Sequence, residues 1–174
     1  LGGCASKQEA SQSLPTTSAA PSTKTLPPLG PKDFPVPVEA RDQTPTGAVE
    51  FVRYYVALAQ FLAKKSLDPR PLLDLSANCR TCSRIAASLS EDRAAGRTYR
   101  DYSFQFNDYA PGLVHGETAE MGFVYVQGPI TVIDRTGKIV ASRSTGVTGK
   151  LQSGASLQWR PEISSWVITT LTVG

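Results

Sequence analysis

Two cysteines separated by two residues, Cys79 and Cys82, are the pair in this sequence best spaced to act together. Such a pair suits a structural disulfide, a thiol–disulfide exchange centre or half of a zinc site. A thiol at the start of a helix, beside Arg80 and Arg84, would have a lowered pKa and be more reactive. A thioredoxin-type centre, however, follows the first strand of a βαβ unit, whereas helical patterns come first here. In an oxidising compartment the pair therefore favours a structural disulfide, with redox exchange as the alternative.

His115 is the only histidine, which excludes a site built from several imidazoles. Zinc on the cysteine pair would need two further ligands, of which His115 could supply one imidazole. His115 and Glu117 could also do acid–base work, but their segment is typical of an exposed loop. The stretch 146–150 resembles a phosphate loop, but it lacks the spacing and the flanking strand and helix. We predict no catalytic residue, no metal and no cofactor.

Cys4 stands within Leu1-Gly2-Gly3-Cys4-Ala5. This stretch matches the lipobox of bacterial lipoproteins, in which a peptidase that needs small residues cuts just before a lipid-modified cysteine. The match predicts that residues 1–3 are a signal-peptide remnant and that the thiol of Cys4 carries a diacylglycerol. Two acyl chains hold a protein firmly at a bilayer, where one chain would not. We expect an extracytoplasmic protein, lipid-anchored to the outer face of the cell membrane.

Residues 4–45 differ in composition from the rest of the 174-residue chain. They contain 8 of the 13 prolines, five serines, five threonines and a single aromatic residue, Phe34. Such a segment cannot bury enough apolar surface to offset the entropy of ordering it. We interpret residues 4–45 as the lipidated cysteine and a disordered Ser/Thr/Pro-rich tether, and residues 46–174 as one folded domain. The net charge of +3 is too small to indicate nucleic-acid binding.

The folded part begins with helical patterns. Apolar residues within 48–62 recur at helical spacing and predict an amphipathic helix of about five turns, capped by Thr46. A short leucine-rich helix follows Pro69. A third helix is expected to be capped by Asn78 and to end at Gly96.

From residue 99 onward, apolar and polar residues alternate, which is typical of strands. Residues 134–137 predict a hairpin turn, and the last strand is expected over 166–173. Helices followed by five or six antiparallel strands indicate the α+β class. The amphipathic helix is expected to lie across one face of a curved sheet.

Seven large aromatic residues could line a pocket between this helix and the sheet, although aromatics at these spacings also suit a plain core. They are Phe51, Tyr55, Phe104, Phe123, Tyr125, Trp159 and Trp166. Arg53 belongs to the polar stripe of the helix and is not expected in such a pocket.

Four stretches of the domain carry a resemblance to a family: Pro45-Thr46-Gly47-Ala48, Phe51-Val52-Arg53-Tyr54-Tyr55, Leu72-Leu73-Asp74-Leu75-Ser76 and Cys79-Arg80-Thr81-Cys82. They look like uncharacterised actinobacterial lipoproteins with a lipobox, a Ser/Thr/Pro linker and one domain with this spaced cysteine pair. That family is similar in layout to the nuclear transport factor 2-like (cystatin-like) superfamily. The resemblance implies an α+β cone, in which N-terminal helices pack into the concavity of a strongly curved antiparallel sheet.

The superfamily includes isomerases, dehydratases, binding modules and dimerisation modules, so the resemblance implies a fold and a location but no single activity. Its enzymes place an Asp, or a His with an Asp, deep in the cone, and Asp101, Asp108 and His115 are not expected there. We therefore expect a non-enzymatic binding or accessory domain in the cell envelope. The alternatives are a small-molecule enzyme that uses the cone cavity and, less favoured, thiol–disulfide exchange at Cys79 and Cys82.

The expected partners follow from these interpretations. They are the membrane, through the lipid on Cys4, and either an envelope protein or a small apolar ligand. Cones of this kind often pair through the outer face of the sheet, where Val124, Val126 and Val132 could form the apolar contact of a homodimer.

Overall fold

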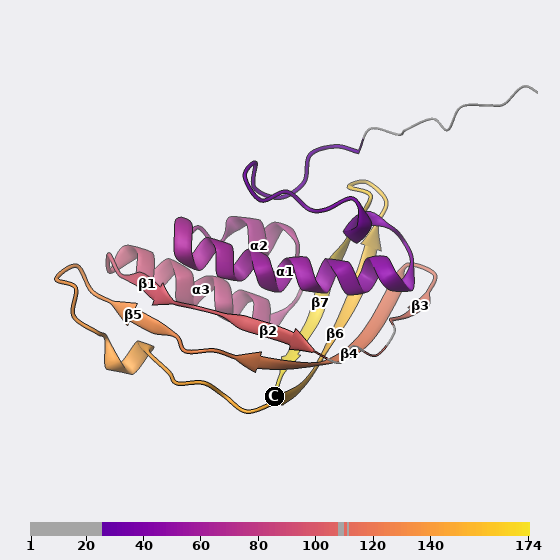
Figure 1. Cartoon of the computed structure of the whole chain (residues 1–174). Coiled ribbons are helices and arrows are strands. Elements are labelled where there is room, and N and C mark those ends of the chain that lie inside the picture. Colours follow the sequence, from indigo (N-terminus) through magenta and orange to yellow (C-terminus); the bar gives the residue numbers. More distant parts are fainter. Residues whose placement is uncertain (1–25, 108–109, 111) are drawn as a thin grey trace, which may run out of the picture.

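The computed structural model describes residues 26–107, 110 and 112–174, in which helices precede an antiparallel sheet (Figure 1). The α-helices are α1 (Pro45–Lys65), α2 (Arg70–Asp74) and α3 (Arg80–Ala94), and two short 3-10 helices are η1 (Glu39–Arg41) and η2 (Ala141–Arg143). The strands are β1 (Thr98–Asp101), β2 (Phe104–Asn107), β3 (Leu113–His115), β4 (Thr118–Gln127), β5 (Thr131–Ile133), β6 (Leu151–Arg160) and β7 (Ser165–Val173). The predicted α+β class is confirmed.

The start of α1 is set by a threonine and a proline. The Thr44 hydroxyl accepts a hydrogen bond from the Gly47 amide at 3.0 Å, and Pro45 takes the first helical position, where no N–H is needed. The prediction of Thr46 as the cap is wrong because Pro45 already belongs to the helix.

The start of α3 is set by the cysteine pair. The sulfur of Cys79 accepts a hydrogen bond from the Cys82 amide at 3.1 Å, so Cys79 is the cap and the prediction of Asn78 is wrong. Asn78 has a φ of +54°, a left-handed conformation that asparagine tolerates better than most residues. Gly96, with a φ of +66°, follows the end of α3 as predicted.

The main sheet has the strand order β2-β4-β6-β7, with β3 also paired to β4, and every pair is antiparallel. β1 and β5 form a separate antiparallel pair. The turn predicted at 134–137 is present, since the Gly137 amide donates to the Asp134 carbonyl at 3.0 Å. The residues that follow this turn, however, do not form a full strand. They make one β-bridge, from Ile139 to Ile133, before the chain enters η2.

The helices lie together on one side of the sheet, and α1 crosses it (Figure 1). Phe51, Leu58, Leu157, Trp166 and Ile168 are buried between the two layers, each less than 3% exposed. A bridge from Ser76 to Ile168 also ties the segment between α2 and α3 to β7. This layout places the apolar stripe of α1 against the inward face of the strands.

Residues 26–44, here called the N-terminal arm, pack on the domain instead of belonging to a disordered tether. Phe34 stacks on Tyr54 and Phe61, with ring centroids 5.5 and 4.7 Å away. Val36 and Ala40 are buried. The boundary predicted at residue 46 is therefore wrong for these residues, because side chains of α1, such as Tyr54 and Phe61, cover the arm's Phe34.

Arg41 fastens the N-terminal arm to the turn between β6 and β7. It is 7% exposed, and its guanidinium donates to the carbonyls of Pro27, Ile163 and Ser164 at 2.6, 2.5 and 3.2 Å. Burial lowers the pKa of Arg41 from its usual value. Nearby, the indole N–H of Trp166 donates to the Asp42 carbonyl at 2.9 Å.

The outer-face patch expected to support a homodimer is not exposed. Val124 and Val132 are buried within the single chain, and Val126 is partly buried. The homodimer itself stays a prediction.

Several expectations lie outside the described residues. They are the signal-peptide remnant, the lipid on Cys4, the tether over residues 4–25 and the position of Asp108. Among the residues that are described, no helix has the length and apolar character needed to cross a membrane.

Candidate functional site

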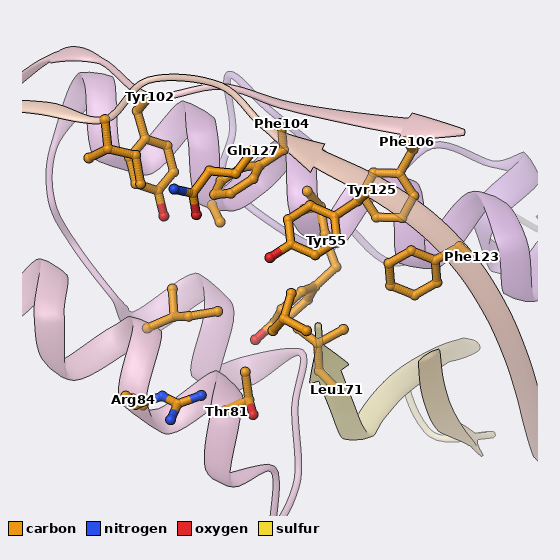
Figure 2. A pocket seen from close by; sticks show the side chains of 15 residues that line it. Tyr55, Thr81, Arg84, Tyr102, Phe104, Phe106, Phe123, Tyr125, Gln127 and Leu171 are labelled. Carbon is orange, nitrogen blue, oxygen red and sulfur yellow. The ribbon is translucent and has the colours of Figure 1, made fainter. Parts of the chain in front are cut away.

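A cavity of about 200 Å³ lies between the helices and the sheet (Figure 2). α1 contributes Tyr55, Val56 and Ala59 to its wall, and α3 contributes Thr81, Arg84 and Ile85. β2, β4 and β7 supply most of the remaining wall. Its position is that of the pocket expected between the amphipathic helix and the sheet.

Aromatic rings form the largest part of the wall. Alternate residues of a strand share one face, so Phe104 and Phe106 of β2 lie beside Phe123 and Tyr125 of β4. Phe106 stacks on Phe123 with centroids 4.7 Å apart, and Phe104 lies 5.9 Å from Tyr125. Tyr102 meets Phe104 edge-on at 5.1 Å. These contacts hold the rings in fixed positions around an apolar space.

The tyrosine hydroxyls of the cavity stay protonated at neutral pH. Burial raises the pKa of Tyr55 to about 12, although a hydrogen bond with Ser76 opposes the shift. Burial, aided by the field of Tyr125, raises the pKa of Tyr102 to about 12. The Tyr55 hydroxyl donates to the Leu72 carbonyl at 3.2 Å. These groups can therefore donate hydrogen bonds, but they are not bases at neutral pH.

Four of the seven predicted pocket residues line this cavity: Tyr55, Phe104, Phe123 and Tyr125. The other three lie elsewhere. Phe51 and Trp166 are fully buried core residues, and Trp159 packs edge-on against Trp166 with centroids 5.2 Å apart. Trp159 of β6 and Trp166 of β7 are paired beside the turn between these strands, whereas the β7 residues of the cavity, Leu171 and Val173, lie near the other end of β7.

Cys79 and Cys82 form a disulfide with their Cα atoms 5.2 Å apart. Both residues are buried, at 3% and 0% exposure. The bond fixes the first turn of α3, and that turn and the next carry Thr81 and Arg84 to the cavity. Figure 2 shows these two side chains on one side of the cavity, opposite Phe104 and Tyr125.

The acid–base candidates lie away from the cavity. His115 ends β3 and is exposed. Asp101 lies in β1, where a hydrogen bond with Thr131 is the main cause that lowers its pKa. The described lining residues include no carboxylate and no imidazole. Within residues 26–107, 110 and 112–174, no group of three or more His, Cys, Asp or Glu could hold a metal ion.

A buried ionic network lies beside the cavity. The Asp92 carboxylate is fully buried and accepts hydrogen bonds from Tyr99, Arg97 and Arg143. Burial alone would raise the pKa of Asp92, but the bonds from Arg143, Tyr99 and Arg97 lower it below its usual value. Because Arg143 belongs to η2, the network holds the segment before β6 against α3.

Sequence reasoning missed several lining residues. Tyr102 and Phe106 alternate with Phe104 along one stretch, so the signal that selected Phe104 could have found them. Thr81 and Arg84 share a helical face at i and i+3, but nothing in the sequence shows which face of α3 meets the cavity.

Several solved structures resemble this chain. The intermembrane space region of the chloroplast protein ARC6 gives a TM-score of 0.54 at 14% identity, covering 73% of this chain and 93% of that one. A nuclear transport factor 2-like superfamily protein from Salmonella enterica gives a TM-score of 0.46 at 16% identity, and the match covers 75% of this chain and 89% of that one. A protein described as nuclear transport factor 2-like with a cystatin-like fold, from Novosphingobium aromaticivorans, gives a TM-score of 0.37 at 17% identity. This match covers 72% of this chain and 79% of that one.

At these identities the likeness concerns the fold alone. Proteins described as nuclear transport factor 2-like are among the similar structures. No protein-family model and no curated protein matches the sequence. Membership of the actinobacterial lipoprotein family stays a prediction.

Proposed function

We propose that this domain binds a small, largely apolar ligand in the cavity between its helices and its sheet, and does not transform it. The observation that carries the proposal is the character of the lining. It includes six aromatic residues, namely Tyr55, Tyr102, Phe104, Phe106, Phe123 and Tyr125. A concave, mostly apolar site with a few polar groups is typical of small-molecule binding.

The size of the cavity limits the ligand. An engineered apolar cavity of about 150 Å³ takes up benzene. A cavity of about 200 Å³ therefore suits a ligand of one or two rings, or a short alkyl chain. Fixed aromatic walls favour a flat apolar group, because ring contacts add to the gain from burial.

Two features make the enzymatic alternatives less favourable. The cavity offers no described carboxylate or imidazole to move a proton, and its tyrosine hydroxyls remain protonated at neutral pH. The Cys79–Cys82 disulfide is buried, whereas an exchange centre needs a sulfur that a partner thiol can reach.

We further propose that the protein acts in the cell envelope, held there by a lipid on Cys4. The support is the sequence around Cys4 and the Pro-, Ser- and Thr-rich composition that follows it. A disulfide between Cys79 and Cys82 agrees with an oxidising compartment. Metabolic labelling with a palmitate analogue tests this part, since Cys4→Ser should abolish the label.

Binding can be tested with N-phenyl-1-naphthylamine, a neutral dye whose fluorescence rises in apolar surroundings. We expect the full chain to bind it at a single site. Val56 lines the cavity, so Val56→Trp should fill the space and lower dye affinity at least about tenfold, the loss that about 1.4 kcal/mol produces.

Val38→Trp is the matched control, because Val38 is 66% exposed and lies outside the cavity lining. It should bind the dye as the unaltered chain does. Dye binding that is absent, or that Val56→Trp leaves unchanged while circular dichroism shows a folded protein, would contradict the proposal.

A further inference from the structure

Arg84 places a positive charge at the edge of the aromatic cavity. It lines this cavity and also an adjoining pocket of about 260 Å³, which Ser88, Tyr99 and Arg143 help to form. The two spaces share Arg84, Ile85, Tyr102 and Ile130. Arg84 therefore lies where an apolar group inside the cavity would meet a polar end outside it.

The charge of Arg84 has no partner among the described residues. No ion pair or hydrogen bond joins its guanidinium to another described side chain or carbonyl. Arg143, the other arginine at these pockets, is already bound to Asp92 at 2.8 Å and lies 3.8 Å from Glu91. Neither pocket contains a described acidic residue. The Arg84 guanidinium is exposed to solvent, and among the described residues of the two pockets it is the positive charge that a ligand can pair with.

We propose that the ligand is a small amphipathic monoanion, such as an aryl-alkyl carboxylate, whose carboxylate pairs with Arg84 while its apolar end contacts the aromatic wall. This inference rests on the proposed function and adds the chemical class of the ligand. A guanidinium presents paired N–H donors that match the two oxygens of a carboxylate. Thr81, one helical turn before Arg84, also lines the cavity and carries a hydroxyl that can donate a hydrogen bond.

A single charge fits this site better than two charges or none. A phosphate monoester would bring nearly two negative charges to one available guanidinium, and the surplus would be left beside an apolar wall. A neutral ligand could accept a hydrogen bond from Arg84 but would lack the stronger, charge-assisted pairing. An amine would be repelled by it.

The test uses three ligands of one shape: 4-phenylbutyrate, 4-phenylbutanol and 4-phenylbutylamine. Each competes with N-phenyl-1-naphthylamine for the full chain at neutral pH and low salt. We expect the acid to bind about two- to fivefold more tightly than the alcohol, the range expected for an exposed charge pair, and the amine to bind most weakly. Raising the salt to about 1 M should remove the difference between acid and alcohol.

Two variants assign the preference to Arg84. In Arg84→Gln, acid and alcohol should bind equally, whereas Arg84→Glu should favour the amine over the acid. Arg80→Gln is the matched control, because Arg80 is exposed on the same helix but lines neither pocket. It should keep the preference for the acid.

The outcomes separate this inference from the proposed function. If the dye binds and Val56→Trp displaces it, but acid and alcohol compete equally, the monoanion inference is overturned and the cavity stays a binding site. A preference for the acid that persists in Arg84→Gln overturns the inference in the same way. If the dye does not bind at all, the proposed function fails and the inference fails with it.

Discussion

Asp92 shows how one residue organises its surroundings. It is a fully buried carboxylate whose charge is neutralised by hydrogen bonds from Tyr99, Arg97 and Arg143. Removing one partner of a buried ion pair leaves the other charge without compensation, which costs about 3–5 kcal/mol. The bonds to Arg143 also fasten η2 to α3, so this carboxylate supports one side of the cavity.

Replacing Asp92 should make stability less dependent on pH. The folded pKa of Asp92 is lowered, so its contribution is present above the unfolded pKa of about 3.9 and is lost as pH falls through the folded pKa. Asp92→Asn should cost about 3–5 kcal/mol at pH 7, and the deficit should shrink below about pH 4. Urea unfolding at pH 7 and pH 3 measures both values.

The control for Asp92→Asn is Glu91→Gln. Glu91 is the exposed neighbour that lies 3.8 Å from the same Arg143, and an exposed pair of this kind contributes about 0–1 kcal/mol. An Asp92→Asn deficit that stays equal at both pH values would show that the carboxylate charge is not the source of the stability.

Ser165→Ala should stabilise the protein. Ser165 is fully buried at the start of β7, and its hydroxyl has no hydrogen-bond partner among the described residues. Removing an unpartnered buried hydroxyl should raise the free energy of unfolding by about 1 kcal/mol. Ser144→Ala should do the opposite, because the Ser144 hydroxyl bonds the Val132 amide and the Val140 carbonyl. Thermal unfolding of both variants tests the contrast, and destabilisation by Ser165→Ala would refute it.

Single residues were the hardest feature to predict from the sequence. Alternation along the strands identified Phe104, Phe123 and Tyr125, because period two fixes which side chains share a face. It could not identify Arg84 or Asp92. Their roles depend on contacts with residues that lie far away in sequence, such as the bond from Arg143 to Asp92.

At the scale of elements, the cysteine pair defines α3. The disulfide closes the turn before the helix, and its Cys79 sulfur also serves as the cap. The sequence predicted a helix in this region and its end at Gly96. It misplaced the cap because Asn78 is a better capping residue by type, whereas the disulfide holds the backbone one residue later.

The two roles of Cys79 can be separated by a pair of variants. Cys79→Ala with Cys82→Ala removes both the bond and the cap, and should cost about 2 kcal/mol for the lost cross-link and about 1 kcal/mol for the cap. Cys79→Ser with Cys82→Ala keeps a capping oxygen, so it should recover the contribution of the cap, about 1 kcal/mol, but not that of the cross-link. Urea unfolding measures the difference, and equal stability of the two variants would exclude the capping role.

At the scale of the whole molecule, the N-terminal arm is part of the domain. A chain that starts at residue 46 loses the Thr44 cap, the stacking of Phe34, the burial of Val36 and the three bonds of Arg41. Burying one large apolar side chain contributes about 1.5–3 kcal/mol, so this chain should be at least about 4 kcal/mol less stable.

A chain that starts at residue 26 keeps all these contacts and should match the full chain in urea unfolding. If the chains that start at residues 26 and 46 unfold at the same urea concentration, the N-terminal arm contributes nothing to the free energy of unfolding, and the prediction is wrong. A matched point variant, Phe34→Ala in the full chain, should show an intermediate loss.

Composition could not reveal the N-terminal arm. Proline-rich segments have no helical or strand period, and their apolar residues are too few to predict a core. The arm is ordered partly by Tyr54 and Phe61 of α1 and partly by partners more than a hundred residues away, since Arg41 bonds Ile163 and Ser164. The order of helices and strands, by contrast, follows from local periodicity, and the sequence predicted it well.

The way in which Arg41 holds the arm has a mechanical consequence. A pull on the N-terminus would enter the domain near Pro27, whose carbonyl is bound to the Arg41 guanidinium. The same guanidinium bonds the turn between β6 and β7, so part of the tension would pass directly into these two long strands. A domain tethered by this end would share the load between its sheet, through Arg41, and α1, through the stacking of Phe34 on Tyr54 and Phe61.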